Sequence, residues 1–149
     1  MSFEITDILG EKVKVIPRIE LYTVKEAIMG TELPGLAVVL DDEKEGCQYA
    51  VLTVSFGEFI GLKNAAYIDT NNCPFAEELL NQGIAENTGL TKQSGFCTYP
   101  LWHFNEDFLK EYGGENYKKY SDAFDDYFSP DEGYEEIDEE GAEMTMGGM

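Results

Sequence analysis

Acidic residues are concentrated at the end of the chain, and this limits which part of it can build a folded core. Residues Asn105 to Met149 carry 15 Asp and Glu against three Lys, and no basic residue follows Lys119. The stretch after Pro130 is rich in Gly and acids, a composition typical of segments that do not fold alone. With 149 residues, 43% of them hydrophobic, the chain is long enough for one core. We therefore expect one domain followed by an acidic tail.

The net charge of −20 restricts the partners that such a chain can bind. Binding to phosphates requires Lys and Arg, so the charge argues against direct contact with nucleic acid or with an anionic membrane. A basic protein surface is the complementary partner. The simpler alternative is that a solvated acidic surface only maintains solubility.

Cysteine content and apolar runs indicate the compartment. Cys47, Cys73 and Cys97 are odd in number and lack CxxC spacing, which argues against a disulfide framework and a structural zinc site. The N-terminus has neither a basic start nor a long apolar run, and no apolar stretch of about 18 residues occurs. We expect a cytoplasmic protein without a metal ion or another cofactor.

Hydrophobic alternation and turn residues predict a mainly antiparallel sheet. The hairpin from Gly35 to Phe56 is the clearest, because the polar connection at 41–46 ends in Gly46. In the last predicted strand, Pro100 favours an edge or a bulge. The predicted strands are Phe3 to Ile8, Val13 to Ile16, Ile19 to Val24, Gly35 to Leu40, Gln48 to Phe56, Asn64 to Asp69 and Phe96 to Phe104.

Capping residues and glycines predict where helices begin and end. The expected helices are Pro74 to Asn81, Glu106 to Tyr112 with Asn105 as its cap, and Glu115 to Phe128, with a helical turn at Val24 to Met29 that ends at Gly30. Ile84 to Gly95 is expected to be a polar loop. The fold class is thus α+β, with a core domain over 1–112, an acidic aromatic helix over 113–128 and an acidic flexible tail over 129–149.

The last predicted helix carries aromatic and acidic residues on different faces. Tyr117, Tyr120, Phe124 and Tyr127 recur at spacings of three and four, which favours one stripe that packs on the core. Asp122, Asp125 and Asp126 lie close enough to repel one another, and a basic partner would relieve that repulsion. The helix therefore predicts a packing face and a separate acidic face.

Two groups of residues resemble a calcium-binding loop and a catalytic site, and the sequence argues against both. Asp69 to Asn72 resembles the start of a calcium loop, but Leu80 stands where the loop needs Glu, so a turn that caps the next helix is favoured. Cys97 could be a nucleophile with His103 and Asp69, as could Ser94. On one extended segment Cys97 and His103 would lie about 20 Å apart, so we expect Cys97 to be a small buried residue and the protein not to be an enzyme.

Two motifs in the middle of the chain resemble a known family. Ala66 to Asn72 reads AYIDTNN, Gln93 to Leu101 reads QSGFCTYPL, and Trp102 follows where an aromatic residue is expected. This pattern resembles the domain-of-unknown-function family DUF4313, small acidic proteins carried by bacterial mobile elements and phages. The resemblance implies a mobile-element context and no particular reaction. As a class, such proteins are similar to anti-restriction and anti-CRISPR inhibitors.

Charge placement and this resemblance lead to one functional hypothesis with two alternatives. The protein is expected to be a non-enzymatic DNA mimic that inhibits a basic nucleic-acid-binding defence nuclease, with a Cas nuclease such as Cas9 as the target. The alternatives are a mobile-element accessory protein that binds through Asp69 to Tyr99 and whose tail serves only solubility, and an enzyme that uses Cys97 and His103. The expected partner-binding residues are Asp122, Asp125, Asp126, Tyr127, Phe128, Asp131, Glu132, Tyr134, Glu135 and Glu136.

Overall fold

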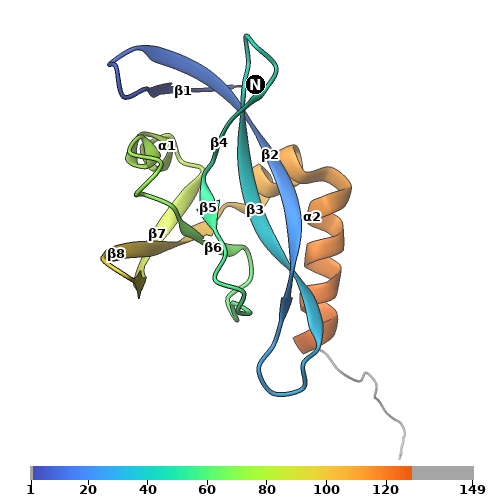
Figure 1. Cartoon of the computed structure of the whole chain (residues 1–149). Helices are drawn as coiled ribbons and strands as arrows, with labels where there is room; N and C mark the ends of the chain where they lie inside the picture. Colours follow the sequence, from blue (N-terminus) through green and yellow to red (C-terminus); the bar gives the residue numbers. More distant parts are fainter. Residues whose placement is uncertain (1, 129–149) are drawn as a thin grey trace, which may run out of the picture.

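The computed structural model describes residues 2–128, which form two antiparallel sheets and two helices (Figure 1). The expected α+β class with mainly antiparallel strands is confirmed. Within residues 2–128, no helix combines the length and the apolar character needed to span a bilayer. The elements are β1 (Phe3–Thr6), β2 (Lys12–Lys25), β3 (Glu32–Asp42), β4 (Gln48–Val51), β5 (Thr53–Val54), β6 (Ala65–Ile68), α1 (Ala76–Asn81), β7 (Ala85–Ser94), β8 (Cys97–Phe104) and α2 (Glu106–Phe128).

The first sheet has the order β1-β2-β3-β4, and the long β2–β3 ribbon dominates it. The pairing of β2 with β3 runs without interruption from Val15 opposite Asp42 to Lys25 opposite Glu32. Along β2, Val15 is buried and its neighbour Lys14 is exposed, which is the alternation that predicted one buried face. The β1–β2 and β3–β4 pairs confirm both predicted hairpins of the first half. The strand predicted over Gln48 to Phe56, however, divides at Leu52 into β4 in this sheet and β5 in the second sheet.

The second sheet has the order β5-β6-β8-β7 and corrects one prediction. Ile84 to Gly95, expected to be a loop, is mostly the edge strand β7, in which only Ala85 is buried. An edge strand pairs on one side through its backbone, so it can form without the apolar alternation that would reveal it. Pro100 in β8 faces Thr91 beside a register shift in β7, which confirms the bulge that the proline predicted.

The connection between β2 and β3 corrects a second prediction. Gly30 has the positive φ expected of it, 70°, and its N–H donates to the carbonyl of Glu26 at 3.1 Å. Val24 and Lys25, however, continue β2, so the segment is a hairpin turn and not a helix. The strand continues because its partner β3 remains paired with it as far as Glu32.

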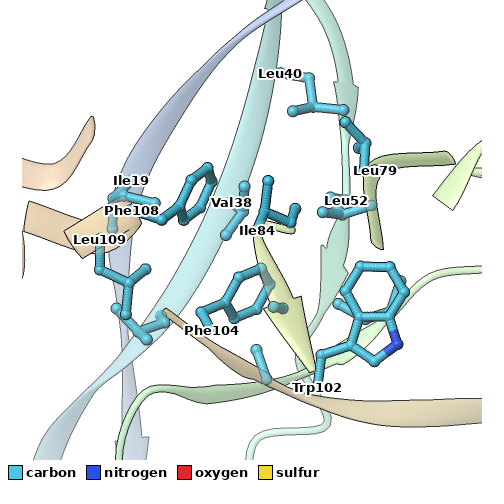
Figure 2. Close-up of a cluster of buried hydrophobic side chains, with 14 of the residues drawn as sticks. Ile19, Val38, Leu40, Leu52, Leu79, Ile84, Trp102, Phe104, Phe108 and Leu109 are labelled. Atoms are coloured by element: carbon cyan, nitrogen blue, oxygen red, sulfur yellow. The ribbon is translucent and has the colours of Figure 1, made fainter. Parts of the chain in front are cut away.

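Helix α2 packs against β2 and β3 and bends at Gly114, whose φ of 49° and ψ of −124° are not helical. The bend lies where Gly113-Gly114 predicted a break between two helices. Figure 1 shows α2 alongside the β2–β3 ribbon, with the second sheet on the opposite side. Buried side chains from both sheets and both helices fill the space between them, among them Val38, Leu79, Trp102, Phe104 and Leu109 (Figure 2).

Asn64 joins the second sheet to α2. Its φ is 66°, its backbone N–H donates to the hydroxyl of Tyr120 at 2.9 Å, and its side-chain oxygen accepts the hydroxyl of Tyr117 at 3.0 Å. Tyr117, Tyr120 and Phe124 are all buried in the core, which confirms the predicted packing role of the aromatic stripe. The opposite face of α2 is therefore left to solvent.

Candidate functional site

Exposed carboxylates lie on both helical segments of α2, before and after the bend at Gly114, and together we call them the acidic face. The aromatic stripe of α2 is buried against the β2–β3 ribbon, so the acidic residues at the intervening positions point outward. All of these carboxylate residues are exposed. The acidic face consists of Glu106, Asp107, Glu111, Glu115, Asp122, Asp125 and Asp126.

The three predicted carboxylates near the end of α2 differ in their partners. Asp125 forms an ion pair with Lys63 from the loop before β6 at 2.9 Å, and Asp122 forms one with Lys118 at 2.8 Å. Asp126 has no ion pair within residues 2–128. Exposed pairs of this kind contribute little to stability, so a basic partner could replace either lysine at small cost.

Four aromatic rings pack together at the C-terminal end of α2, and we call them the end cluster: Phe59, Phe124, Tyr127 and Phe128. The ring of Phe59 lies 5.2 Å from Tyr127 and 6.0 Å from Phe128, and Phe124 lies 4.8 Å from Phe128, all between ring centroids. Phe128 keeps 53% of its surface exposed. Of the two predicted aromatic anchors, Phe128 is thus the more available, whereas Tyr127 is engaged with its neighbours.

Tyr127 is held by Glu26, a buried carboxylate in the turn between β2 and β3. The Tyr127 hydroxyl donates to Glu26 Oε2 at 3.2 Å, and the backbone N–H groups of Ile28, Met29 and Thr31 also donate to this carboxylate. Burial alone would raise the pKa of Glu26, but these hydrogen bonds outweigh it and place the pKa below its ordinary value. The charged carboxylate therefore fixes the turn against the end of α2.

The same turn exposes apolar side chains beside the end cluster. Ile28 and Met29 are 89% and 79% exposed at the tip of the β2–β3 connection, which lies near the end of α2 in Figure 1. Phe128, two residues after Asp126, also exposes apolar surface at this end of α2. This end of the molecule therefore combines exposed carboxylates with exposed apolar side chains. The remaining predicted site residues lie outside the described residues: Asp131, Glu132, Tyr134, Glu135 and Glu136.

A second surface lies on the outer face of the second sheet, where the motif residues gather. The ring of Phe56 lies 5.6 Å from Tyr67 of β6 and 5.3 Å from Tyr99 of β8. Lys92 of β7 lies over the Phe56 ring at 5.3 Å and also pairs with Glu58 at 2.8 Å. Of these residues, Lys92 and Tyr99 belong to the segment from Asp69 to Tyr99 through which the accessory-protein alternative would bind.

Asp69 organises the turn after β6, as predicted. Its side chain accepts the backbone N–H and the amide of Asn72, and its carbonyl accepts the N–H of Cys73. The prediction that this turn caps the next helix is wrong. Helix α1 begins at Ala76, and no side chain caps its N-terminus. No group of three or more metal-ligating side chains occurs within the described part of the chain.

The structure does not bring the candidate nucleophiles together with a base. Cys97 and His103 lie at opposite ends of β8, and Ser94 pairs with Cys97 across the hairpin. Cys97 is half-buried and not fully buried as expected, whereas Cys73 is buried. Burial, with a contribution from the Asp69 charge, raises the pKa of the Cys73 thiol to about 11.

Sequence reasoning missed Glu26 and Asn64, two polar residues that accept hydrogen bonds from tyrosines of α2 or donate hydrogen bonds to them. Glu26 lies four residues before Gly30, and that spacing was the only available signal of a turn. Nothing around Asn64 distinguishes it from a surface asparagine in a loop. Both roles depend on tyrosines of α2 that are more than fifty residues away.

Comparison with known proteins supports the resemblance. Residues 29–124 match the family model described as Domain of unknown function (DUF4313). The match covers both sequence motifs, the last residues of the β2–β3 turn from Met29 onward, and α2 as far as Phe124. No curated protein and no solved structure matches the chain.

Proposed function

The chain belongs to the DUF4313 family, whose description names no activity, and we propose its function from the properties of its surface. We propose that the protein is a non-enzymatic inhibitor that mimics DNA and occupies the nucleic-acid cleft of a basic defence nuclease. The proposed target is a CRISPR effector such as Cas9, and the proposed location is the bacterial cytoplasm. The observation that carries this proposal is the acidic face, held on the outside of a helix whose other face is part of the core.

The anchoring of α2 favours binding by a preformed surface. Tyr117 and Tyr120 fix the helix through Asn64, and Tyr127 fixes its end through Glu26. A surface that is already ordered loses less conformational entropy when it binds. Asp122, Asp125 and Asp126 belong to this anchored segment, and the side chain of Phe128 supplies apolar contact area beside them.

The electrostatics favour a partner that normally binds phosphates. A net charge of −20 attracts basic surfaces over a distance and raises the rate of encounter at low salt. The same attraction weakens as salt screens it. A DNA mimic should therefore respond to salt and should be displaced by DNA.

A second candidate function rests on the aromatic surface of the second sheet. Phe96, at the tip of the β7–β8 hairpin, is fully exposed at 106%, and the Phe56, Tyr67 and Tyr99 rings lie on the same sheet. Exposed aromatic surface is typical of protein-binding sites. In this alternative the protein is an accessory factor of a mobile element, and the acidic residues only keep it soluble.

The decisive experiment measures binding to purified Cas9 with its guide RNA at about 100 mM and about 500 mM salt, with and without competing duplex DNA. We expect the D122N/D125N/D126N variant to bind at least about tenfold more weakly and with a smaller salt dependence, since each lost charge removes a contact that salt screens. The matched control E32Q/E43Q/E45Q removes three exposed charges from the β2–β3–β4 region and should bind as the unmodified protein does.

Unchanged affinity of the triple variant would count against the mimic, as would binding that neither salt nor DNA affects. If Cas9 itself does not bind, the same salt and DNA conditions applied to proteins captured from a bacterial lysate identify the target nuclease class. Removal of residues 129–149 separates the two candidates, because the mimic would lose affinity and the accessory factor would not.

A further inference from the structure

A cavity of about 530 Å³ opens at the far end of α2 from the end cluster. It lies between the start of β1, the turn after α1 and the first two turns of α2. Its volume is within the range of small-ligand sites, roughly 300–1,000 Å³. The side chains that matter here are Phe3, Asp107, Phe108, Glu111 and Tyr112.

Three aromatic rings form one wall of this cavity. The centroid of Phe3 lies 6.0 Å from that of Phe108 and 6.0 Å from that of Tyr112, and Phe108 and Tyr112 are 5.1 Å apart. Phe108 is buried, whereas Phe3 and Tyr112 are half-exposed. The faces of aromatic rings carry partial negative charge and attract cations.

Carboxylates form the rim of the same cavity. Asp107 and Glu111 are four residues apart on α2, so they are neighbours on one helical face and repel each other. Glu106, also at the rim, is paired with Lys110 at 2.9 Å, and neither Asp107 nor Glu111 has an ion pair within residues 2–128. No Lys, Arg or His of the described chain lines the cavity.

We infer that this cavity receives an arginine side chain of a partner protein. A planar guanidinium can stack on an aromatic ring and donate to two carboxylates at once, whereas the lysine ammonium is compact and more strongly hydrated. The carboxylate rim repels anionic groups. A guanidinium between Asp107 and Glu111 would also remove the repulsion between them.

This inference deepens the proposed function and rests on it for the source of the arginine. Nucleic-acid-binding proteins read bases and phosphates with arginine, so a target nuclease would present such side chains to a mimic. The cavity adjoins the first carboxylates of the acidic face. Glu106 lines both this cavity and a second hollow that includes Asp122, so the occupant would bind beside the part of the acidic face that contains Asp122.

The cavity is tested with a probe that does not require the partner. The full chain, labelled with ¹⁵N, is titrated with N-acetyl-arginine methylamide, and with the citrulline analogue, which has the same shape and no charge. We expect shift changes at Phe3, at 82–84 and at 106–112, with citrulline at least fivefold weaker. D107N/E111Q should weaken arginine binding at least fivefold, and the control E43Q/E45Q should not change it. Shifts spread over all exposed acids, or equal binding of citrulline, would overturn the inference.

The partner assay then tests the source of the arginine. If D107N/E111Q weakens binding to the nuclease about tenfold while its amide spectrum stays folded, the inference is supported. If D122N/D125N/D126N weakens binding and D107N/E111Q does not, the inference fails and the DNA-mimic proposal stands. If neither variant changes nuclease binding, the mimic proposal fails, and the arginine titration alone decides whether the cavity binds guanidinium.

Discussion

The hydroxyl of Tyr127 donates a hydrogen bond to the carboxylate of Glu26 at 3.2 Å, joining two residues that are 101 positions apart. Glu26 closes the β2–β3 turn, and Tyr127 lies one residue before the end of the described chain. This contact fixes the last turn of α2 against the first sheet. The position of Phe128 and of the last carboxylates therefore depends on a residue in a distant hairpin.

Replacing Glu26 by Gln should lower the melting temperature by several degrees. The neutral amide keeps the shape, but it accepts weaker hydrogen bonds from Ile28, Met29, Thr31 and Tyr127 than the carboxylate does. Thermal unfolding followed by circular dichroism measures the change. Tyr127→Phe, which keeps the ring against Phe59, should show a smaller loss because only one of these bonds disappears.

The effect of Glu26 should depend on pH. Its pKa is lower in the folded protein than the ordinary value of 4.5, so the folded state favours the charged form. The stabilisation is fully present above about pH 5 and is lost as the pH falls through the lowered folded pKa. The stability difference between the unmodified protein and Glu26→Gln should therefore shrink below about pH 4.5. A difference that stays constant from pH 7 to pH 3 would show that the charge has no part in it.

Substitution of Asn64 should destabilise the folded protein more than substitution of an exposed asparagine does. Ala at this position would face a left-handed φ, which costs roughly 1–2 kcal/mol, and would leave the buried Tyr117 hydroxyl without its acceptor, which costs roughly 1–3 kcal/mol more. Denaturant unfolding measures the loss. Asn64→Gly, which tolerates the backbone conformation, should lose less than Asn64→Ala, and Asn71→Ala on the exposed turn should lose little.

Gly113 should not accept a side chain. A Cβ there would lie 2.7 Å from Cβ of Tyr117 and 3.2 Å from Cβ of Ile19, atoms that cannot move without the backbone. Overpacking of this kind costs about 1–3 kcal/mol, more than the roughly 0.5–1 kcal/mol that Ala gains over Gly in a helix. Gly61→Ala is the matched control, because nothing lies within 4 Å of its new Cβ. Equal stability of the two variants would contradict the close packing of α2 on β2.

The cysteines should differ in reactivity. Cys47 is exposed, whereas Cys73 is buried with a pKa near 11, so only about one molecule in a thousand carries its thiolate at pH 8. Timed alkylation with iodoacetamide and mass spectrometry should modify Cys47 first and Cys73 only when the protein unfolds. Rapid modification of Cys73 in the folded protein would show that α1 and its turn open readily.

Local patterns in the sequence predicted the hairpins and both parts of α2. The alternation around Val15 and the glycine pair at Gly113-Gly114 describe interactions between residues close in the chain, and such interactions leave a readable pattern. The edge strand β7 left no such pattern. Its backbone pairs with β8, and its side chains are mostly exposed, so they can be polar. The sequence therefore resembles that of a loop.

The candidate site likewise has features that the sequence predicts and features that depend on the fold. The sequence alone determined the excess of carboxylates after Asn105 and the separation of aromatic from acidic positions, because charge and helical spacing are properties of the chain. The folded structure was needed to show that Asp125 pairs with Lys63, that Tyr127 donates to Glu26, and that the rings of Phe3 and Tyr112 lie together. Each of these contacts joins residues from distant parts of the chain, and no local pattern encodes which distant residues the fold will bring together.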